Sequence, residues 1–294
     1  MKQIVVISGK GGTGKTSITA GLASMAAPLV LADCDVDAAD LHLVLKPEVR
    51  EITSFESGIL ASLDPDLCTR CGACVEACRF GAISESFRIR PGHCEGCGAC
   101  AFVCPAQAVT LSPRRCGEWY VSDTRCGPMV HAALDIGAEN SGKLVSLVRA
   151  KSEQLAREQG LDFVLVDGSP GIGCPVIASL TGADAALLVA EPSLSALHDL
   201  MRVVRLLAHF KIPAFVLLNK CDLSPGLAQR VREYCRQESL PLVGEIPLNP
   251  LFVQAQLAGK TVAELDPLGL GRTLAEIWGR LARNGTESNG LLNP

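Results

Sequence analysis

The feature that most constrains this chain is a glycine-rich segment near its N-terminus, GKGGTGKT at residues 9–16. An apolar run at residues 4–7 precedes it, and residues 17–25 predict a helix. The spacing G-x-x-x-x-G-K-[ST] between a strand and a helix is typical of phosphate-binding loops. Its glycines let backbone N–H groups turn towards an anion, and the helix points its positive end at the same charge. The segment predicts a nucleotide site rather than a simple glycine-rich turn.

Individual residues of this loop have distinct expected roles. Lys15 is expected to reach the β- and γ-phosphates, and the Thr16 hydroxyl to ligate Mg²⁺. The other residues expected to contact the nucleotide here are Gly11, Gly12, Thr13, Gly14 and Ser17.

Composition narrows the class of protein. The chain has 294 residues, 48% of them hydrophobic and 20% charged, and a net charge of −4. These values predict a globular protein of one large or two modest domains, with no general nucleic-acid-binding surface. No apolar run reaches the length of a membrane span and no signal peptide precedes the first strand, so we expect a cytoplasmic protein without membrane insertion. Fourteen cysteines favour metal or redox chemistry over disulfides.

Two further apolar runs end in carboxylates. Residues 29–32 lead into the acidic segment 33–37, and residues 163–166 lead into DGSPG at 167–171. Carboxylates that follow buried parallel strands face the ligand crevice of an open α/β sheet. The alternatives are a solvated acidic loop at the first segment and a simple turn at the second.

With Lys10, the loop resembles the deviant Walker A sequence of the MinD/ParA/Mrp group of ATPases. The resemblance implies a nucleotide-dependent homodimer in which Lys10 crosses to the partner's phosphates; a solvated loop lysine is the alternative. It also implies that Asp35 orients the attacking water, that Asp33 lies near Mg²⁺, and that Asp167 holds a Mg²⁺-bound water. Gly168 or Gly171 would sense the γ-phosphate through the backbone.

A third motif concerns the base. The predicted strand 214–218 ends in Asn219, Lys220, Cys221 and Asp222, which looks like the N-K-x-D motif that reads guanine. In the MinD group a similarly placed Asn contacts adenine, and a loop corresponding to Pro247 packs on the base. The resemblance carried by Lys10 favours ATP, with GTP as the alternative.

The cysteines form a doubled pattern. C-x2-C-x2-C-x3-C occurs at residues 68–78 and again at residues 94–104. This is the spacing of bacterial ferredoxins, in which the fourth cysteine ligates the other [4Fe–4S] cluster. The pattern predicts two clusters, one held by Cys68, Cys71, Cys74 and Cys104, and the other by Cys94, Cys97, Cys100 and Cys78. Two zinc sites are the alternative. Arg79 stands where the second run has Pro105, which departs from the family pattern.

These motifs predict a domain organisation. We expect a mostly parallel, doubly wound α/β sheet in residues 1–59 and 113–282, with a small α+β ferredoxin-like domain inserted at 60–112. Strands are expected near 52–55, 118–122 and 185–190. A helix is expected after a cap at residues 139–143, running to about residue 159, and further helices at 195–209 and at 268–282, the last packed on the sheet. Residues 283–294 are expected to be disordered.

Six cysteines remain, and most are expected to be small buried hydrophobes. Cys174 follows the switch strand at the spacing used by the nitrogenase iron protein to bridge two subunits, but no cysteine stands near residues 140–141, where the second ligand belongs.

The favoured function is an ATP-gated electron carrier that serves an unidentified redox or iron–sulfur partner protein. An iron–sulfur assembly ATPase like Mrp and a ParA-type positioning ATPase are the alternatives.

Overall fold

The protein is described by a computed structural model that covers residues 1–26, 28–135, 138 and 141–287, with the side chains of 284–287 left out. The chain forms two compact units. The larger unit comprises Met1–Ile52, Trp119–Ala133 and Ser141–Pro294; the smaller comprises Thr53–Glu118 and Leu134–Asn140. The chain therefore leaves the larger unit and returns to it.

A parallel sheet organises the larger unit. Its central strands β1 (Lys2–Ile7), β2 (Val30–Asp33), β6 (Phe163–Asp167) and β7 (Ala185–Ala190) follow the order β2-β6-β1-β7. Strands β8 (Ala214–Asn219) and β9 (Leu242–Ile246) continue it on one side, and β5 (Gly127–Leu134) on the other. Every one of these pairings is parallel, which confirms the expected doubly wound α/β class.

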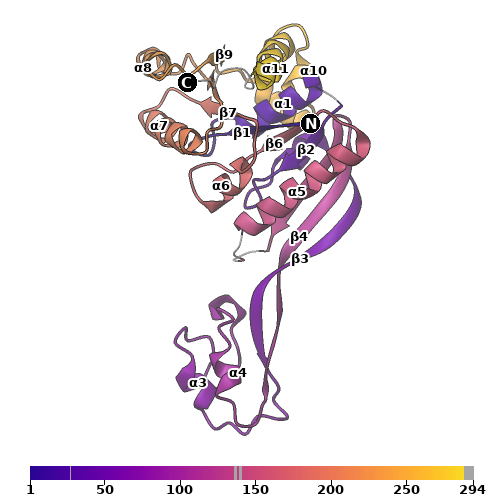
Figure 1. The fold of residues 1–294 in the computed structure, drawn as a ribbon, viewed down its shortest axis with the longest axis vertical. Helices are drawn as coiled ribbons and strands as arrows, with labels where there is room; N and C mark the ends of the chain where they lie inside the picture. Colours follow the sequence, from indigo (N-terminus) through magenta and orange to yellow (C-terminus); the bar gives the residue numbers. More distant parts are fainter. Residues whose placement is uncertain (27, 136–137, 139–140, 288–294) are drawn as a thin grey trace. The chain divides into compact units, whose positions relative to one another are not determined.

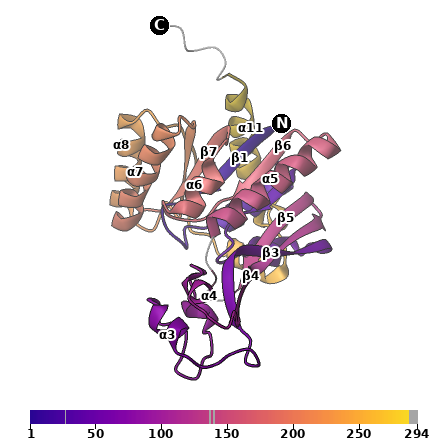
Figure 2. The same ribbon diagram turned by 60° about the horizontal axis from the view of Figure 1, so that its bottom comes forward.

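Helices cover both faces of this sheet (Figures 1 and 2). One face carries α1 (Lys15–Ala26), α10 (Val262–Leu265) and α11 (Leu270–Glu287), with α2 (Leu41–Leu45) and α9 (Leu251–Ala258) beside them. The other carries α5 (Ser141–Gln159), α6 (Cys174–Leu180), α7 (Leu194–His209) and α8 (Pro225–Gln237).

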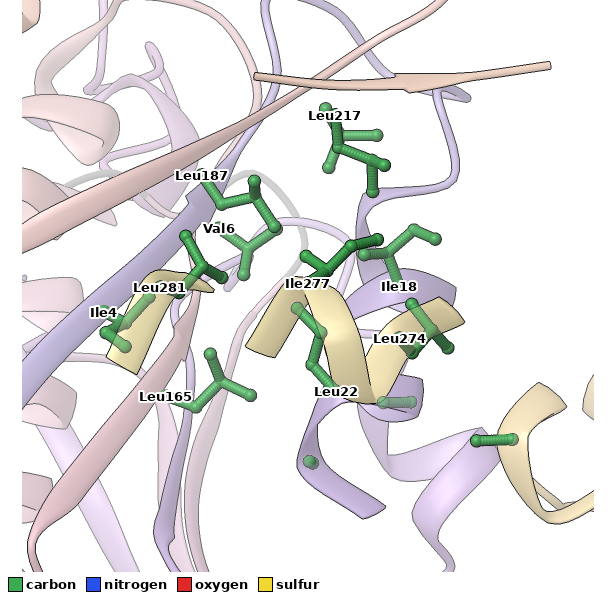
Figure 3. Close-up of a cluster of buried hydrophobic side chains, with 14 of the residues drawn as sticks. Ile4, Val6, Ile18, Leu22, Leu165, Leu187, Leu217, Leu274, Ile277 and Leu281 are labelled. Atoms are coloured by element: carbon green, nitrogen blue, oxygen red, sulfur yellow. The ribbon is translucent and has the colours of Figure 1, made fainter. Parts of the chain in front are cut away.

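The core of the first face joins α1 and α11 to the sheet. Figure 3 shows Leu22 of α1 and Leu274 and Ile277 of α11 beside Val6 and Leu187 of the strands, all fully or almost fully buried. A Cβ on Gly21 would lie 2.6 Å from Leu274 Cδ1, so the close approach of the two helices requires glycine there. The last helix packs on the sheet, as expected, because its apolar stripe finds this surface.

Two strands of sixteen residues each, β3 (Glu48–Leu63) and β4 (Val109–Thr124), run from the larger unit into the smaller. The smaller unit also holds α3 (Ala73–Ala77) and α4 (Ala99–Phe102), a short 3-10 turn at Pro91–His93, and an antiparallel bridge between Ile83 and Ile89. It reaches Thr53 and Glu118, beyond the predicted limits 60 and 112, because both strands continue past the cysteine segments. The strands expected at 52–55 and 118–122 are sections of β3 and β4.

Other elements differ from the sequence-based expectation. β5 was not predicted; it follows β4 after a two-residue turn at Arg125–Cys126. The last helix extends to Glu287, past the predicted end at 282. Residues 288–294 of the expected disordered tail, and Glu139 and Asn140 of the expected helix cap, lie outside the described residues. Among the described residues, no helix combines the length and apolarity needed to cross a bilayer.

Candidate nucleotide site and cysteine centre

The loop between β1 and α1 borders an open cleft of about 860 Å³ in the larger unit. Its lining includes six of the predicted loop residues and the predicted catalytic Asp35: Gly11, Gly12, Gly14, Lys15, Thr16, Ser17 and Asp35 are all present. Sequence analysis did not single out Ala38, Asp40, Val44 or Gln256, which line the same cleft. Only Asp40 carried any signal, as a further carboxylate after the acidic segment.

Lys15 lies among three carboxylates at the start of α1. Its Nζ is 2.9 Å from Asp167 Oδ1 and 3.3 Å from Asp35 Oδ2, and its side chain is only 6% exposed. Burial lowers the pKa of Lys15, but attraction by Asp167, Asp35 and Asp33 outweighs it, so the net shift is upward. Lys15 is therefore held as a cation that points into the phosphate end of the cleft.

Asp167 ends β6 and is completely buried. Its Oδ1 accepts hydrogen bonds from Lys15 and from Thr19 Oγ1, while Oδ2 has no hydrogen-bond partner among the described residues. A buried carboxylate oxygen left without a partner is costly unless a cation or an ordered water meets it. Asp35, Asp33 and the Thr16 hydroxyl lie around the same lysine, and carboxylate and hydroxyl oxygens are ligands that Mg²⁺ prefers.

Asp33 and Asp35 shape the loop that follows β2. Asp33 Oδ1 accepts from the Asp35 backbone N–H at 3.1 Å, and Asp33 Oδ2 accepts from the Leu41 N–H at the start of α2 at 3.3 Å. Burial and the nearby Asp167 raise the pKa of Asp33 well above its ordinary value. Burial also raises the pKa of Asp35, with Lys15 acting against it. One lysine among three carboxylates leaves a surplus of negative charge that a divalent cation would offset.

The Lys10 side chain binds residues of its own chain in this structure. Its Nζ is 2.7 Å from Glu191 Oε1 and donates to the hydroxyls of Ser193 and Ser195 at 3.2 and 3.4 Å. Burial raises the pKa of Glu191, but hydrogen bonds from Lys10 and Lys220 lower it by more, so the carboxylate stays ionised. The Lys10 ammonium group is thus bound by a carboxylate and two hydroxyls of its own chain while the side chain stays 32% exposed, and its expected role at a partner's phosphates remains a prediction.

The residues expected to read the base support the loop. Asn219 Nδ2 donates to the Thr13 carbonyl at 2.8 Å, and Lys220 Nζ donates to the Gly12 carbonyl at 2.7 Å. Gly14 has φ 93° and a Cβ there would lie 2.5 Å from Asn219 Nδ2, so this glycine is required twice over. Neither Asn219 nor Asp222 nor Pro247 belongs to the described lining of the cleft. Asp222 Oδ1 instead accepts from the Leu248 N–H at 2.6 Å, next to Pro247.

The two glycines expected to sense the γ-phosphate already use their N–H groups. Gly168 donates to the Val6 carbonyl and Gly171 to the Ser8 carbonyl, both at 2.9 Å. A γ-phosphate contact through either N–H therefore requires that its bond to the neighbouring strand or loop first breaks.

The eight motif cysteines lie in the smaller unit in two similar arrangements. Cys78 lines one cavity of about 360 Å³ together with Cys94, Cys97 and Cys100. Cys78 Sγ accepts from the Ala82 N–H at 3.3 Å, and Cys104 Sγ accepts from the Ala108 N–H at the same distance. The repeated sequences thus form repeated N–H···S bonds, which stabilise thiolate sulfur.

Within each cysteine set, the thiols interact through their charges. Burial raises the pKa of Cys74, with Cys68 and Cys104 adding to the shift through their charge. Burial likewise raises the pKa of Cys100, with Cys94 and Cys97 adding. In the described part of the chain no three His, Cys, Asp or Glu side chains are placed to hold a single metal ion. A [4Fe–4S] cluster takes its four thiolates on four different irons, and eight cysteines, three of which (Cys68, Cys78 and Cys104) accept N–H···S bonds, are a donor set that fits two such clusters.

Of the remaining cysteines, Cys34, Cys116, Cys126 and Cys235 are buried, as expected for small hydrophobes. Cys221 is half-buried. Cys174 is exposed at the first residue of α6. The position expected for a second bridging ligand, Asn140, lies outside the described residues.

Comparison with known proteins identifies the nucleotide-binding part of the chain. The family model "CobQ/CobB/MinD/ParA nucleotide binding domain" matches residues 4–262. An uncharacterised protein of Methanocaldococcus jannaschii is 34% identical over 222 residues, which are 74% of this chain and 78% of that protein.

Solved structures show the same fold at lower identity. The cell division ATPase MinD of Pyrococcus furiosus superposes with a TM-score of 0.58 at 21% identity, covering 96% of this chain and 99% of that one. MinD of Pyrococcus horikoshii in complex with Mg-ADP gives 0.59 at 20% identity, covering 99% and 98%. The phosphate-binding loop, the carboxylates around Lys15 and the family match lead to one conclusion: the chain belongs to the CobQ/CobB/MinD/ParA nucleotide-binding family and is a MinD/ParA-like P-loop ATPase.

Proposed function

We propose that this ATPase is an iron–sulfur protein that couples nucleotide binding to electron transfer through two [4Fe–4S] clusters. The observation that carries the proposal is the pairing of Cys78 with the second cysteine run, since Cys78, Cys94, Cys97 and Cys100 line one cavity although Cys78 belongs to the first run. Exchange of the fourth cysteine between two runs is the ligation pattern of two-cluster ferredoxins.

Residues 60–112 act in this proposal as an inserted two-cluster domain between the ATPase segments 1–59 and 113–282. Cys68, Cys71, Cys74 and Cys104 hold one cluster, and Cys94, Cys97, Cys100 and Cys78 the other. Each cluster, when bound, supplies a one-electron carrier. A unit this small has little apolar core, with Ala61, Cys74, Ile83, Cys100 and Val109 as its buried centre, so cluster ligation adds to its stability.

The larger unit binds and hydrolyses ATP in this proposal. Lys15 neutralises the β- and γ-phosphates, and Thr16 and, through water, Asp167 hold Mg²⁺. Asp35 orients the attacking water, and Lys10 leaves Glu191 to complete the site of a second copy in a nucleotide-dependent homodimer. Positioning and charge neutralisation are the catalytic contributions expected for phosphoryl transfer.

Helix α2 links the nucleotide cleft to the cluster-bearing segment, so nucleotide binding can affect that segment through this helix. Val44 of α2 and Asp40, the residue just before α2, line the nucleotide cleft. The Leu41 N–H at the start of the helix donates to Asp33. Only two residues separate the end of α2 at Leu45 from the start of β3 at Glu48, which leads into the smaller unit. A change at the acidic loop therefore shifts the root of β3 directly.

The guanidinium of Arg125, in the turn after β4, fastens the far end of α2. It donates to the Leu45 carbonyl at 2.7 Å and the Val44 carbonyl at 3.1 Å, and forms a two-fold hydrogen-bonded pair with Glu264 at 2.6 and 2.8 Å. The same helix thus contacts the nucleotide cleft, the strand that leaves for the cysteines and the turn by which the chain returns.

The test is anaerobic purification followed by EPR-monitored redox titration with and without ATP and Mg²⁺. We expect about eight irons per chain, as two cubanes require. Coupling of about 1–3 kcal/mol between sites is typical, which corresponds to a shift of roughly 40–130 mV in a one-electron potential. Iron near four, or zinc in place of iron, would remove the two-cluster proposal. Identical potentials with and without nucleotide would remove the gating.

Two other functions compete. A ParA-type positioning ATPase shares the fold, as MinD in complex with MinC from Aquifex aeolicus illustrates at a TM-score of 0.59, but it leaves the eight cysteines without a role. An assembly ATPase would pass its clusters to an acceptor protein. Clusters that transfer to an apo-ferredoxin during ATP turnover, at unchanged potentials, would favour assembly.

A further inference from the structure

We infer that the cleft beside Cys68 in the smaller unit docks an acidic segment of a partner protein. The inference rests on the proposed electron-transfer function and names the surface through which it operates. The cleft has about 1210 Å³ of space, open to solvent, and Cys68, Arg70 and Arg88 are among its lining residues. It is separate from the cavity lined by the second cysteine set.

The charged side chains that line this cleft are all positive. Arg70 lies within the first cysteine run and Arg88 between the two runs, and no Asp or Glu is among the described lining of the cleft. Across the described residues, neither guanidinium takes part in an ion pair or a side-chain hydrogen bond, whereas Arg50, Arg115 and Arg125 each pair with a carboxylate. Two unpaired arginines facing one cleft are a site for carboxylates, which Arg binds through paired N–H donors.

Local backbone hydrogen bonds hold the two segments that carry these arginines. Arg70 has φ 56° and its N–H donates to Cys68 Sγ at 3.4 Å. Phe87, beside Arg88, has φ 58° and its N–H donates to the Ser84 carbonyl, while the Arg88 N–H donates to Ser84 Oγ at 3.1 Å. Left-handed backbone at two non-glycine residues is uncommon, and here both residues line the same cleft.

Shape favours a protein segment over a small free anion. Apolar side chains, Leu60, Leu63 and Ile89 among them, form much of the wall, and Pro65 and Pro91 stiffen its rim. A citrate-sized anion satisfies the two arginines but leaves these apolar walls uncovered, whereas a segment with interleaved apolar and acidic side chains covers both. The walls add contact area and the arginines set the orientation and the rate of encounter.

Docking here places the partner next to Cys68, a ligand of the first proposed cluster. A cluster held by Cys68, Cys71, Cys74 and Cys104 would, when bound, supply one electron to an oxidised redox centre of the partner, which would be reduced by one electron without any change in covalent bonds.

The experiment uses a fluorescein-labelled peptide of alternating Glu and Leu as the probe, with the anaerobically purified full chain. Fluorescence anisotropy is measured for wild type, for Arg70→Gln/Arg88→Gln, and for a matched variant with the same charge change outside the cleft, Arg79→Gln/Arg114→Gln. We expect binding to wild type that weakens with salt, loss of about fivefold or more in affinity in the cleft variant from two exposed ion pairs, and near-normal binding in the matched variant.

Several results would overturn the docking site: no binding to wild type, equal losses in both variants, or citrate binding as tightly as the peptide at equal carboxylate concentration. Iron content and cluster EPR signals, recorded on the same samples, keep the two proposals apart. Normal clusters with no cleft-dependent binding reject the docking site alone, and cleft-dependent binding without iron rejects the electron-transfer function alone.

Discussion

Lys10 Nζ and Glu191 Oε1 lie 2.7 Å apart, so the loop lysine that the family resemblance assigns to a partner's phosphates is bound here by a carboxylate of its own chain. Glu191 also binds Lys220 at 3.0 Å, and Lys220 in turn bonds the Gly12 carbonyl. If Lys10 is to reach a partner in a dimer, this ion pair must first break, and its Glu191 side chain is only 15% exposed to solvent.

Removing that competition should favour the dimer. We expect Glu191→Gln to strengthen ATP-dependent dimerisation by about threefold, in line with the modest energy of a partly exposed ion pair, as measured by analytical ultracentrifugation. Lys10→Ala should abolish the ATP-dependent dimer. In the Lys10→Ala background Glu191→Gln should have no effect, and an unchanged threefold effect there would show that Glu191 acts through Lys220 instead.

Lys15 and Asp35 should separate binding from hydrolysis. Lys15→Ala should abolish ATP binding, because Lys10, the other cation of the loop, is paired with Glu191, and three carboxylates remain beside the phosphates. Asp35→Ala should keep ATP binding and lose hydrolysis by a factor of about 100 or more, trapping an ATP-bound dimer that gel filtration detects. Normal turnover by Asp35→Ala would assign the water-orienting role to another residue.

The crossed ligation by Cys78 can be tested by single substitutions. Cys78→Ser should disturb the cluster of Cys94, Cys97 and Cys100, because those four side chains share a cavity. Cys104→Ser should instead disturb the cluster of the first run. EPR spectra of the two variants should lose different signals, and loss of the same signal in both would contradict the exchange of fourth ligands.

The Arg125–Glu264 pair should hold α2 against the body of the larger unit. A hydrogen bond from Arg125 lowers the pKa of Glu264 to about 2, although burial acts in the opposite direction. Arg125→Gln should lower the free energy of unfolding by about 1–2 kcal/mol, because two α2 carbonyls and Glu264 lose a charged donor. It should also reduce any nucleotide-induced shift of the cluster potentials.

Arg157→Gln is the matched control for Arg125. It removes an exposed ion pair to Glu153 in the same unit, with Arg157 71% exposed, so it should change stability by well under 1 kcal/mol. Chemical denaturation followed by tryptophan fluorescence suits both variants, because Trp119 and Trp278 belong to the larger unit. Equal effects of the two substitutions would remove the special role of Arg125.

His131 should give the larger unit a pH dependence of its own. It is buried in β5, with Nε2 2.9 Å from Ser122 Oγ and its ring stacked on Tyr120 at 4.9 Å. Burial, with a smaller effect of nearby His42, lowers the pKa of His131 to about 4 from 6.5. The folded state thus resists protonation, and stability falls as pH drops from 6.5 towards 4, by about 2 kcal/mol at pH 5.

His131→Gln keeps a hydrogen-bonding side chain but does not titrate. The difference in unfolding free energy between pH 7.5 and pH 5 should be smaller in this variant than in wild type. An equal difference in both proteins would show that carboxylates alone cause the loss of stability.

The sequence alone determined the features that depend on local spacing. The phosphate-binding loop, the carboxylates after β2 and β6, and the doubled cysteine runs each lie within a few residues, so side-chain chemistry and chain geometry suffice to identify them. The parallel sheet followed from short apolar runs separated by helical segments. The sequence pattern was sufficient to place six cleft-lining loop residues and Asp35 in one site.

Tertiary structure alone decided what those groups touch. Glu191, 181 residues after Lys10, binds that lysine, and Asn219 supports Thr13 rather than lining the cleft; such contacts join separate strands, which no local pattern encodes. The same holds for Gln256 in the cleft and for Arg125 at the end of α2, which become neighbours only once the sheet and its helices are packed. The limits of the smaller unit could not be predicted from the sequence. β3 and β4 each run from one unit into the other, and no change in composition along them marks where one unit ends.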